Sequence, residues 1–348
     1  MEYKSLTLKR KEGLNSFSKK VAKIIDPKIK EILGSFVDKK TQKLVNYQIE
    51  VGGKRIRPAL AILSCLACGG KIEDVLYPAA GLEILHNYTL IVDDIIDKSE
   101  LRRGKPTAWR KFGKSIAECV NVDYSAAVFQ TANRSKNHLE ISEIFAEAMK
   151  AIADGEILDI LFEQSGREDE PYIAENRYFS IADKDYFRMV GKKTATLFQA
   201  CCEVGGICAQ ARNKGMESLR NYGFNLGIAF QIKDDTLDIF GEEKKFGKKI
   251  GNDIRERKLG NIVVSRSLKE LPRQERQKIL SILKQKKIKN SDIKKVIKAV
   301  KKTNAKENTS KLGERYIKEA KESLKLLPQN KWSSILEEVA DFAMGREK

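Results

Sequence analysis

Two aspartate clusters of the form Asp-Asp-x-x-Asp are the residues best suited to chemistry in this sequence. Their carboxylates belong to Asp93, Asp94, Asp97, Asp234, Asp235 and Asp238. Each cluster lies in an apolar segment of helical spacing, and on a helix residues four positions apart share a face. The first and last aspartates of a cluster therefore project the same way and repel each other, by about 0.2–0.5 kcal/mol when exposed. Each pair needs a counter-cation.

Oxygen ligands without histidine or cysteine favour a hard cation such as Mg²⁺. This ion takes few protein carboxylates, keeps several waters and completes its octahedron with phosphate oxygens. One such cluster arises often by chance, whereas two on separate predicted helices, about 140 residues apart, are a specific signal. We therefore predict two carboxylate walls that face one bound diphosphate.

Basic residues gather at glycine-containing breaks close to these clusters. The four segments are 52–58 (GGKRIRP), 101–107 (LRRGKPT), 191–194 (GKKT) and 247–253 (GKKIGND). Arginine binds phosphate oxygens bidentately and lysine adds point charge, so these segments suit a diphosphate. His86 lies seven residues, or two helical turns, before Asp93, and the shared face favours a ligand contact. His138 has no such context, and we assign it no role.

Apolar residues recur at helical spacing over most of the chain, and no convincing two-residue alternation appears. We therefore predict an all-α fold in which strands are at most incidental. The predicted helix breaks fall at Gly52-Gly53, Gly69-Gly70, 104–106, 166–171, Gly205-Gly206, 241–251 and Leu271-Pro272. No low-complexity segment separates two halves, so we predict one domain that covers residues 1–348.

The composition narrows the classes of partner. Lysine and arginine number 66 against 48 aspartates and glutamates, and the net charge of +18 indicates an anionic partner. The six cysteines lie mostly among aliphatic residues, as reduced core thiols do in a cytosolic chain. The first thirty residues lack the uninterrupted apolar core of a signal peptide, and the longest weakly polar stretch, 58–70, is shorter than the roughly 20 residues that span a bilayer. We therefore expect a cytoplasmic protein without an integral membrane segment. A solvated face explains the lysine-rich stretch 273–325 better than a nucleic-acid stripe, and no nucleic-acid-binding motif accompanies it. We expect no nucleic-acid partner.

Taken in order, these motifs resemble those of the trans-isoprenyl diphosphate synthases, the polyprenyl synthetase family, and most of all its archaeal geranylgeranyl type. The match runs from about Gln48 to the end and comprises GGKRIRP, His86, DDIID, RRGKPT, GKKT, QIKDDTLD, GKKIGND and the terminal REK. The resemblance implies a single-domain, all-α helical bundle of the isoprenoid synthase type around a deep central cavity, usually as a homodimer. One departure is Val122 before Asp123, where the family usually has Gly-Asp, and we expect altered helix packing there with unchanged chemistry.

By position, the resemblance implies a role for each matched residue. The six aspartates would bind Mg²⁺ and, through it, the allylic diphosphate. Contacts to that diphosphate are implied for Arg102, Lys193, Lys249 and Lys258, with Lys248 as a rival for Lys249. Contacts to the diphosphate of isopentenyl diphosphate are implied for Lys54, Arg57, His86 and Arg103. Thr194 and Gln231 would line the reacting carbons, and with Lys193 they form the implied catalytic set.

The implied reaction condenses isopentenyl diphosphate with dimethylallyl, geranyl or farnesyl diphosphate. The allylic C–O bond ionises with the help of Mg²⁺ and cationic side chains, the double bond of isopentenyl diphosphate attacks the carbocation, and a proton passes to the released diphosphate. The protein would supply orientation, charge neutralisation and a dry apolar cavity.

Product length in this family depends on side chains just before the first aspartate cluster. Tyr88 and Thr89 are the fifth and fourth residues before Asp93, and at 1.5 Å per residue Tyr88 lies roughly 7.5 Å away along the helix axis. A bulky floor argues against long polyprenyl products, and an aromatic residue followed by a small one resembles the archaeal type. Geranylgeranyl diphosphate is the expected product, and farnesyl diphosphate is the alternative.

Three alternatives come from other classes of protein. A class I terpene cyclase shares the first aspartate cluster but needs no second diphosphate site. A non-catalytic subunit of a heteromeric synthase would be expected to lose one cluster, and both are intact. A basic helical nucleic-acid binder explains the charge of +18 but leaves two carboxylate clusters unexplained. A short-chain isoprenyl diphosphate synthase accounts for all the features.

Overall fold

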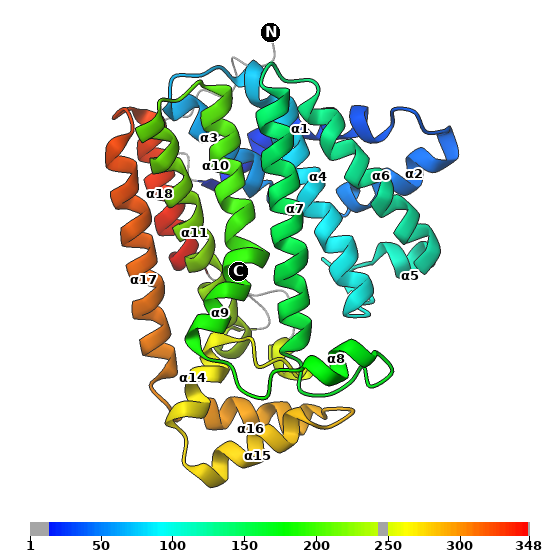
Figure 1. The fold of residues 1–348 in the computed structure, drawn as a ribbon, viewed down its shortest axis with the longest axis vertical. Helices are drawn as coiled ribbons and strands as arrows, with labels where there is room; N and C mark the ends of the chain where they lie inside the picture. The colour runs from blue at the N-terminus through cyan, green and yellow to red at the C-terminus, as the bar shows by residue number, and fades with distance from the viewer. Residues whose placement is uncertain (1–13, 243–249, 347–348) are drawn as a thin grey trace. The chain divides into compact units, whose positions relative to one another are not determined.

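The computed structural model describes residues 14–242 and 250–346, and nearly all of their regular structure is helical (Figure 1). The prediction of an all-α fold is confirmed. Among the described residues the strands are limited to β1 (Leu101–Arg102) and β2 (Lys105–Pro106), which form a short antiparallel hairpin. No helix in that part of the chain is long and apolar enough to cross a membrane.

The chain divides into two compact units, each assembled from three segments. The first unit comprises the residues up to Lys150, Leu197–Phe224 and Ala320–Phe342. The second comprises Ala151–Thr196, Asn225–Glu319 and the residues from Ala343 onward. A single domain over residues 1–348 stays a prediction.

Helices make up both units. The first contains α1 (Leu14–Leu33), α2 (Lys39–Glu50), α3 (Ile56–Ala67), α4 (Ile72–Ile96), α5 (Ala108–Phe112), α6 (Lys114–Ala132) and the 3₁₀ turn η3 (Leu324–Leu326). The second contains α8 (Pro171–Asn176), α9 (Asp183–Val190), the π-helical turn η2 (Gly191–Ala195), α13 (Asn252–Arg255), α14 (Ile262–Glu270), α15 (Arg273–Leu283) and α16 (Asn290–Val300). Residues in both units belong to α7 (His138–Leu161), α10 (Thr196–Cys208), α11 (Asn213–Phe240), α17 (Ala305–Ser323) and α18 (Lys331–Gly345).

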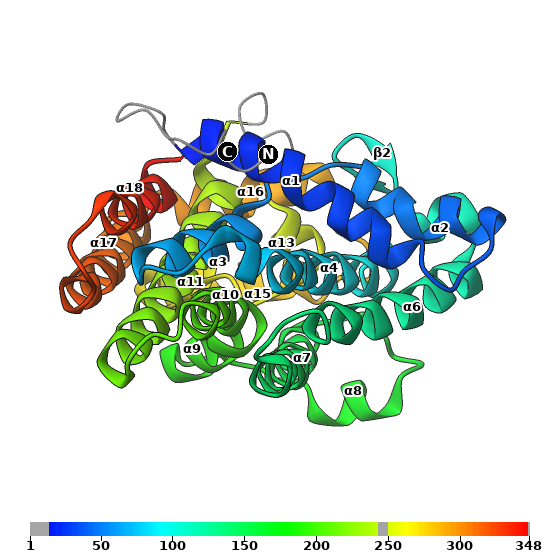
Figure 2. The ribbon, with the colours of Figure 1, turned by 90° about the horizontal axis from the view of Figure 1, so that it is seen from above.

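Within the first unit, α4 packs against α1, α3 and α6 (Figure 2). Its middle turns are buried on all sides, which is typical of a helix that is apolar around its whole circumference. A Cβ at Gly81 would lie 2.1 Å from Thr131 Oγ1 on α6 and 3.0 Å from the ring of Phe145 on α7. The absence of a side chain there allows close packing, and α4 holds the first aspartate cluster on a rigid support.

The predicted break at Gly205-Gly206 is wrong, because α10 continues through both glycines. A Cβ at Gly205 would lie 2.3 Å from the carbonyl oxygen of Ala61 on α3, and one at Gly206 would lie 2.6 Å from Met216 Sδ on α11. These glycines therefore let helices of the first unit approach closely. Gly52, by contrast, has a φ of 99° and does separate α2 from α3 as predicted.

The departure from the family pattern lies on the surface of α6. Val122 is 70% exposed, so it makes little packing contact within the first unit. Its neighbour Asp123 is partly buried, and burial raises the pKa of this carboxyl group.

Arg55 anchors the loop between α2 and α3 to the core of the first unit. It is 3% exposed and adopts a left-handed conformation with a φ of 53°. Its guanidinium group donates to Asp26 Oδ1 on α1 (2.7 Å), to Glu83 Oε1 on α4 (3.0 Å) and to the carbonyl oxygen of Ile49 (3.1 Å). Burial raises the pKa of Glu83, and the charge of Arg55 opposes that rise. A buried ion triad therefore fixes the GGKRIRP loop.

An apolar core organises the second unit. Buried side chains from separate helices meet in it, including Phe162, Val190, Ile232, Ile262 and Val296. Segment 257–259 adds to this core by pairing with 162–164, where the Leu259 N–H donates to the carbonyl oxygen of Phe162 (3.1 Å). This pairing fixes the backbone on both sides of Lys258.

The buried triad generates a stability prediction. We expect Arg55→Met to lower the free energy of unfolding by about 3–5 kcal/mol, because it leaves the Glu83 carboxylate buried without its partner. The measurement is urea denaturation followed by circular dichroism. The double variant Arg55→Met/Glu83→Leu should recover part of the loss.

Arg315→Met is the matched control for this prediction. Arg315 is an arginine of α17 whose side chain is 62% exposed and pairs with Glu319 (3.2 Å). Removing it should change the free energy of unfolding by less than about 1 kcal/mol. Equal losses in the two arginine variants would contradict an anchoring role for Arg55.

Candidate active site

The first aspartate cluster lies at the C-terminal end of α4, with its outer and middle carboxylates in different surroundings. Asp93 and Asp97 are partly exposed, and the Asp97 N–H donates to the carbonyl oxygen of Asp93 (2.8 Å), so the last helical turn is intact. Asp94 is 2% exposed and accepts two hydrogen bonds from Arg102, from Nε (2.9 Å) and Nη2 (2.8 Å). The middle aspartate thus holds the β1–β2 hairpin against α4.

This hairpin presents two of the predicted phosphate-binding arginines. Arg103 and Gly104 form its turn with φ values of 53° and 76°, the left-handed conformation at both central positions of a two-residue hairpin turn. A Cβ at Gly53 would lie 3.1 Å from Arg103 Nη1, so the glycine opening of GGKRIRP makes room for the arginine. The structure therefore brings two of the predicted basic motifs together.

His86 lies among arginines of these two motifs. Burial lowers its pKa well below the usual range, and the positive charges of Arg57 and Arg103 lower it further. The imidazole is therefore neutral at pH 7. Arg103 itself is exposed at the turn of the hairpin. Lys54, predicted for the same role, is exposed on the loop. The cluster is suited to an anion, because a bound negative charge relieves the repulsion among its cations.

Lys193 and Lys258 converge on Asp159 in the second unit. Lys193 Nζ lies 2.6 Å from Asp159 Oδ2 and 2.5 Å from Glu156 Oε2, and Lys258 Nζ lies 3.0 Å from the same oxygen of Asp159. Burial raises the pKa of Asp159, but the two lysine charges outweigh burial and hold the pKa below its usual range. The sequence assigned both lysines to the allylic diphosphate. It missed the carboxylates, whose one signal is their spacing of three residues on α7.

The GKKT segment forms the π-helical turn η2, not the loop break that the sequence predicted. This turn continues α9 into α10, and π-helical turns occur frequently at functional sites. Gly155 on α7 makes room for it, because a Cβ there would lie 2.4 Å from the backbone nitrogen of Lys193. The close approach positions Lys193 and Thr194.

A chain of hydrogen bonds joins η2 to the second aspartate cluster. Thr194 Oγ1 lies 2.9 Å from Gln231 Oε1, and Gln231 Nε2 donates to Asp235 Oδ1 (2.9 Å). The Tyr186 hydroxyl (2.9 Å) and the Ile262 N–H (3.0 Å) both donate to Asp235 Oδ2. Asp235 is 4% exposed, so the middle aspartate is again a buried positioning group.

Asp238 faces a further carboxylate that the sequence did not identify. It accepts hydrogen bonds from the backbone N–H groups of Asn252 (2.9 Å) and Asp253 (3.2 Å), and Asn261 Nδ2 donates to Asp253 (2.7 Å). Burial, followed by the negative charge of Asp253, raises the pKa of Asp238 to about 8. Burial and Asp253 likewise raise the pKa of Asp235. A bound cation would relieve this mutual repulsion.

Asp234, the first aspartate of this cluster, pairs with Arg346 near the end of the chain. The Asp234 oxygen lies 2.9 Å from Arg346 Nη2, which also donates to the carbonyl oxygen of Phe230 (2.7 Å). The guanidinium group stacks 3.5 Å from the centre of the Phe230 ring. The predicted contacts of Lys248 and Lys249 lie outside the described residues.

The two clusters fit a divalent cation by the chemistry of their donors. Each presents carboxylate oxygens, the ligands that Mg²⁺ and Ca²⁺ prefer. In the described residues, no three His, Cys, Asp or Glu side chains are placed to hold an ion by themselves. Mg²⁺ takes few protein ligands and completes its shell with phosphate oxygens and water.

The proposed tail-pocket residues, Tyr88 and Thr89, precede the first aspartate cluster on α4. Tyr88 is partly exposed, and Thr89 donates its hydroxyl to the carbonyl oxygen of His86 (2.8 Å). Their effect on product length stays a prediction.

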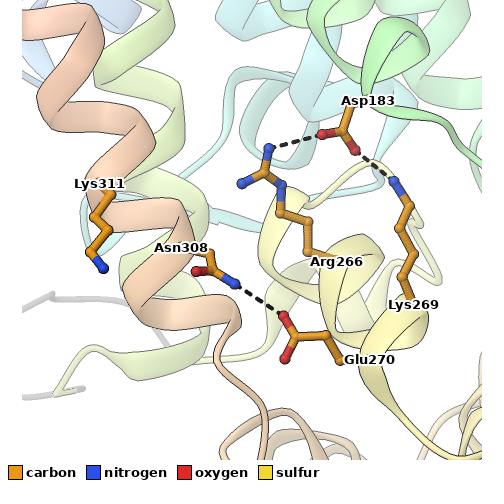
Figure 3. Close-up of a pocket in the computed structure, with 6 residues that line it drawn as sticks. All are labelled: Asp183, Arg266, Lys269, Glu270, Asn308 and Lys311. Atoms are coloured by element: carbon orange, nitrogen blue, oxygen red, sulfur yellow. Dashed lines mark hydrogen bonds and ion pairs between the residues drawn. The ribbon is translucent and has the colours of Figure 1, made fainter.

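A hollow of about 420 Å³ in the second unit lies beside α14 and α17 and does not coincide with the predicted site (Figure 3). Its lining residues are Asp183, Arg266, Lys269, Glu270, Asn308 and Lys311. Asp183 accepts from both Arg266 (2.8 Å) and Lys269 (2.6 Å), so two cations share this carboxylate. None of the residues that the sequence assigned to the diphosphates lines this hollow.

The sequence matches the family model of polyprenyl synthetases over residues 38–300. The chain belongs to the polyprenyl synthetase family. It is 35% identical to the short chain isoprenyl diphosphate synthase of Methanocaldococcus jannaschii, with 84% of this chain and 85% of that protein covered. It is 34% identical to the geranylgeranyl diphosphate synthase of Saccharolobus solfataricus, with 85% and 87% covered.

Solved structures agree with this assignment. The geranylgeranyl pyrophosphate synthetase of Pyrococcus horikoshii matches with a TM-score of 0.84 at 30% identity and covers 99% of this chain and 100% of its own. A polyprenyl synthase of Caulobacter crescentus, solved with calcium and isoprenyl diphosphate, matches with a TM-score of 0.84 at 29% identity and covers 96% and 97%. The predicted family, fold class and prenyltransferase activity are confirmed.

Gly155 generates a prediction about the position of Lys193. We expect Gly155→Ala to lower kcat by roughly tenfold to a hundredfold, because the added methyl group displaces η2 and with it the lysine beside Asp159. The measurement is steady-state turnover, with circular dichroism to confirm folding. Gly215→Ala on α11 is the control, since a Cβ there meets only ordinary contacts at 3.7 Å and beyond. Full activity of the folded Gly155 variant would contradict the proposed role of η2.

Proposed function

We propose that this prenyltransferase condenses isopentenyl diphosphate with allylic diphosphates to form geranylgeranyl diphosphate, with Mg²⁺ held at the two aspartate clusters. The observation that carries the proposal is the presence of both aspartate clusters together with two separate sets of cations. One set lies around His86 in the first unit, and the other meets at Asp159 in the second. Two diphosphate groups need two such sets.

The allylic diphosphate is proposed to bind to the aspartate clusters through Mg²⁺ and directly to Arg102, Lys193 and Lys258. Bound Mg²⁺ would supply charge neutralisation for the leaving diphosphate. Lys193 and Lys258 are held by one carboxylate, Asp159, so their positive charges are positioned before the substrate arrives. Such preorganised charge costs little reorganisation when negative charge develops on the leaving group.

Isopentenyl diphosphate is proposed to bind at Lys54, Arg57, His86 and Arg103. The lowered pKa of His86 keeps its imidazole neutral, so it contributes a hydrogen bond without adding to the repulsion among the arginines. The Arg57 guanidinium stacks 5.2 Å from the ring centre of Phe198, which orients it. This second diphosphate site distinguishes a synthase from a terpene cyclase.

In the proposed reaction the allylic C–O bond breaks and its electron pair leaves with the diphosphate. The double bond of isopentenyl diphosphate then forms the new C–C bond, and a proton from the adjacent carbon passes to the released diphosphate. Thr194 and Gln231 are proposed to line the reacting carbons. Their mutual hydrogen bond and the bond from Gln231 to Asp235 fix both side chains.

Geranylgeranyl diphosphate is proposed as the product because Tyr88 and Thr89 would close the tail pocket at medium length. Several relatives carry the name geranylgeranyl diphosphate synthase, including the protein of Saccharolobus solfataricus. Farnesyl diphosphate is the competing product, because a phenol side chain so close to the cluster would end elongation at a shorter tail. A single domain over residues 1–348, a homodimer and a cytoplasmic location stay predictions.

Metal dependence is the first test of the proposal. We expect incorporation of radiolabelled isopentenyl diphosphate with dimethylallyl, geranyl or farnesyl diphosphate to require Mg²⁺ and to stop with EDTA. Asp93→Asn should lower kcat by at least about a hundredfold, because it removes a carboxylate that is proposed to hold Mg²⁺ against the leaving diphosphate. Asp74→Asn on the same helix is the control, since Asp74 lies in the first turn of α4, away from the cluster, and pairs with the exposed Lys136 (3.2 Å). Absence of incorporation with every primer would refute the catalytic proposal.

Product length is tested at Tyr88. We expect Tyr88→Ala to lengthen the product by one or more C₅ units, because removing the phenol deepens the tail pocket. The measurement is chromatography of the dephosphorylated products. Tyr77→Ala is the control, because Tyr77 lies on the same helix and its hydroxyl bonds to Glu31 (2.8 Å) at the surface. An unchanged product distribution in the Tyr88 variant would refute the pocket-floor assignment.

A further inference from the structure

The hairpin of α15 and α16 in the second unit concentrates positive charge on a small surface. Residues 273–302 contain twelve basic and two acidic residues, so this stretch supplies +10 of the chain's net charge of +18. All twelve basic side chains are exposed. Among the described residues, only Lys295 and Lys302 of the twelve form ion pairs, with Asp292 (2.8 Å) and Glu275 (3.3 Å). We call this surface the basic hairpin.

The opposite side of the hairpin packs against the apolar core of the second unit. α15 and α16 contact each other (Figure 1), and α16 also contacts α13 and α14. Its branched aliphatic residues lie on one helical face and are buried: Ile293, Val296, Ile297 and Val300. Ile279 and Leu283 of α15 are buried in the same core, and Leu280 and Ile282 are partly buried against it. The basic hairpin therefore has no apolar face left for insertion, and its partner must be bound by charge.

The chemistry of the cations limits the class of partner. Ten of the twelve are lysines, which act as mobile point charges and lack the planar fork with which arginine recognises individual phosphate groups. Residues 273–302 contain no aromatic side chain on which a nucleic-acid base could stack. Such a surface suits a dense, laterally mobile layer of negative charge.

We propose that the basic hairpin holds the enzyme at the surface of an anionic phospholipid bilayer. Clusters of four to eight lysines or arginines are typical of proteins that bind acidic lipid surfaces electrostatically. The choice of a membrane rests on the proposed function, because a C₂₀ isoprenyl diphosphate is an amphiphile that partitions into a bilayer. The enzyme would then release its product next to the phase that takes it up.

The test is co-sedimentation of the full-length chain, without substrates, with vesicles of phosphatidylcholine alone or of equimolar phosphatidylcholine and phosphatidylglycerol. We expect binding to the anionic vesicles only, and its loss at roughly 1 M salt, where the Debye length falls to about 3 Å. Reversing three charges along α16 and its C-cap residue, in Lys294→Glu/Lys298→Glu/Lys301→Glu, should weaken binding by at least about a hundredfold.

A matched variant separates the basic hairpin from net charge. Lys39→Glu/Lys40→Glu/Lys43→Glu reverses three exposed lysines of α2 in the first unit and changes the total charge by the same amount. It should retain most of the vesicle binding. Equal losses in both variants, or equal binding to neutral vesicles, would overturn the proposal. Displacement of the vesicles by a mixed-sequence RNA would assign the surface to nucleic acid instead.

Turnover in vesicle-free solution keeps this proposal distinct from the proposed function. The α16 variant should retain full turnover of isopentenyl diphosphate, because none of its substituted residues belongs to the candidate active site. Vesicle binding by a chain without prenyltransferase activity would leave the basic hairpin established and remove its link to the product. If the triple variant loses both turnover and helicity, it has misfolded, and the single variant Lys298→Glu takes its place in the test. This single variant should keep full turnover and weaken vesicle binding about fivefold.

Discussion

Like charges held close together by a few buried counter-charges are the constraint on which this structure depends. A site for two diphosphates needs many cations within a small volume, and those cations repel one another in the absence of substrate. In the second unit the carboxylate of Asp159 resolves this conflict by pairing with both Lys193 and Lys258. The lysine charges keep the pKa of Asp159 low despite burial, so the carboxylate is ionised at pH 7 and pairs with both lysines.

The first unit solves the same problem with arginine. Arg102 forms two hydrogen bonds with Asp94, and Arg55 spans Asp26 and Glu83. The planar guanidinium group has donors in a fixed geometry, so each pair fixes the direction of a backbone segment as well as neutralising a charge. The GGKRIRP loop has a left-handed conformation at Arg55, and the β1–β2 hairpin has one at Arg103. The ion pairs of Arg55 and Arg102 hold these two segments in place and so stabilise the unfavourable conformations.

The sequence identified the motifs because their chemistry depends on residue type and on local spacing. The sequence could not show which aspartate of a cluster is buried and which is partly exposed. Asp93 and Asp94 are identical in type and differ only in the side of α4 on which they lie. Asp159 and Tyr186 were missed for a related reason. Each acts on a motif that is distant in sequence, and no local pattern encodes such a contact.

Glycine shows most clearly where sequence reasoning stops. Gly52 and Gly205 are both followed by another glycine, and both were expected to end helices. Gly52 does so through its positive φ, whereas Gly205 lies inside α10 and lets Ala61 of α3 approach to within 2.3 Å of its would-be Cβ. Gly155 plays the same part for η2. Whether a glycine ends a helix or allows close packing is decided by its tertiary neighbours, which propensity does not contain.

The distribution of cation types follows from the same electrostatic argument. Where a positive charge must be held in one direction within a buried setting, the chain uses arginine, as at positions 55 and 102. Where lysine is buried, as at position 258, a carboxylate lies within 3.0 Å of its ammonium group. On the basic hairpin, lysine is exposed and mostly without such a partner among the described residues. The desolvation cost of an unpaired ammonium explains this division, because it is large in the interior and absent at the surface. A cation that no carboxylate holds is therefore stable only where water, or the charged surface of a partner, takes the place of that carboxylate.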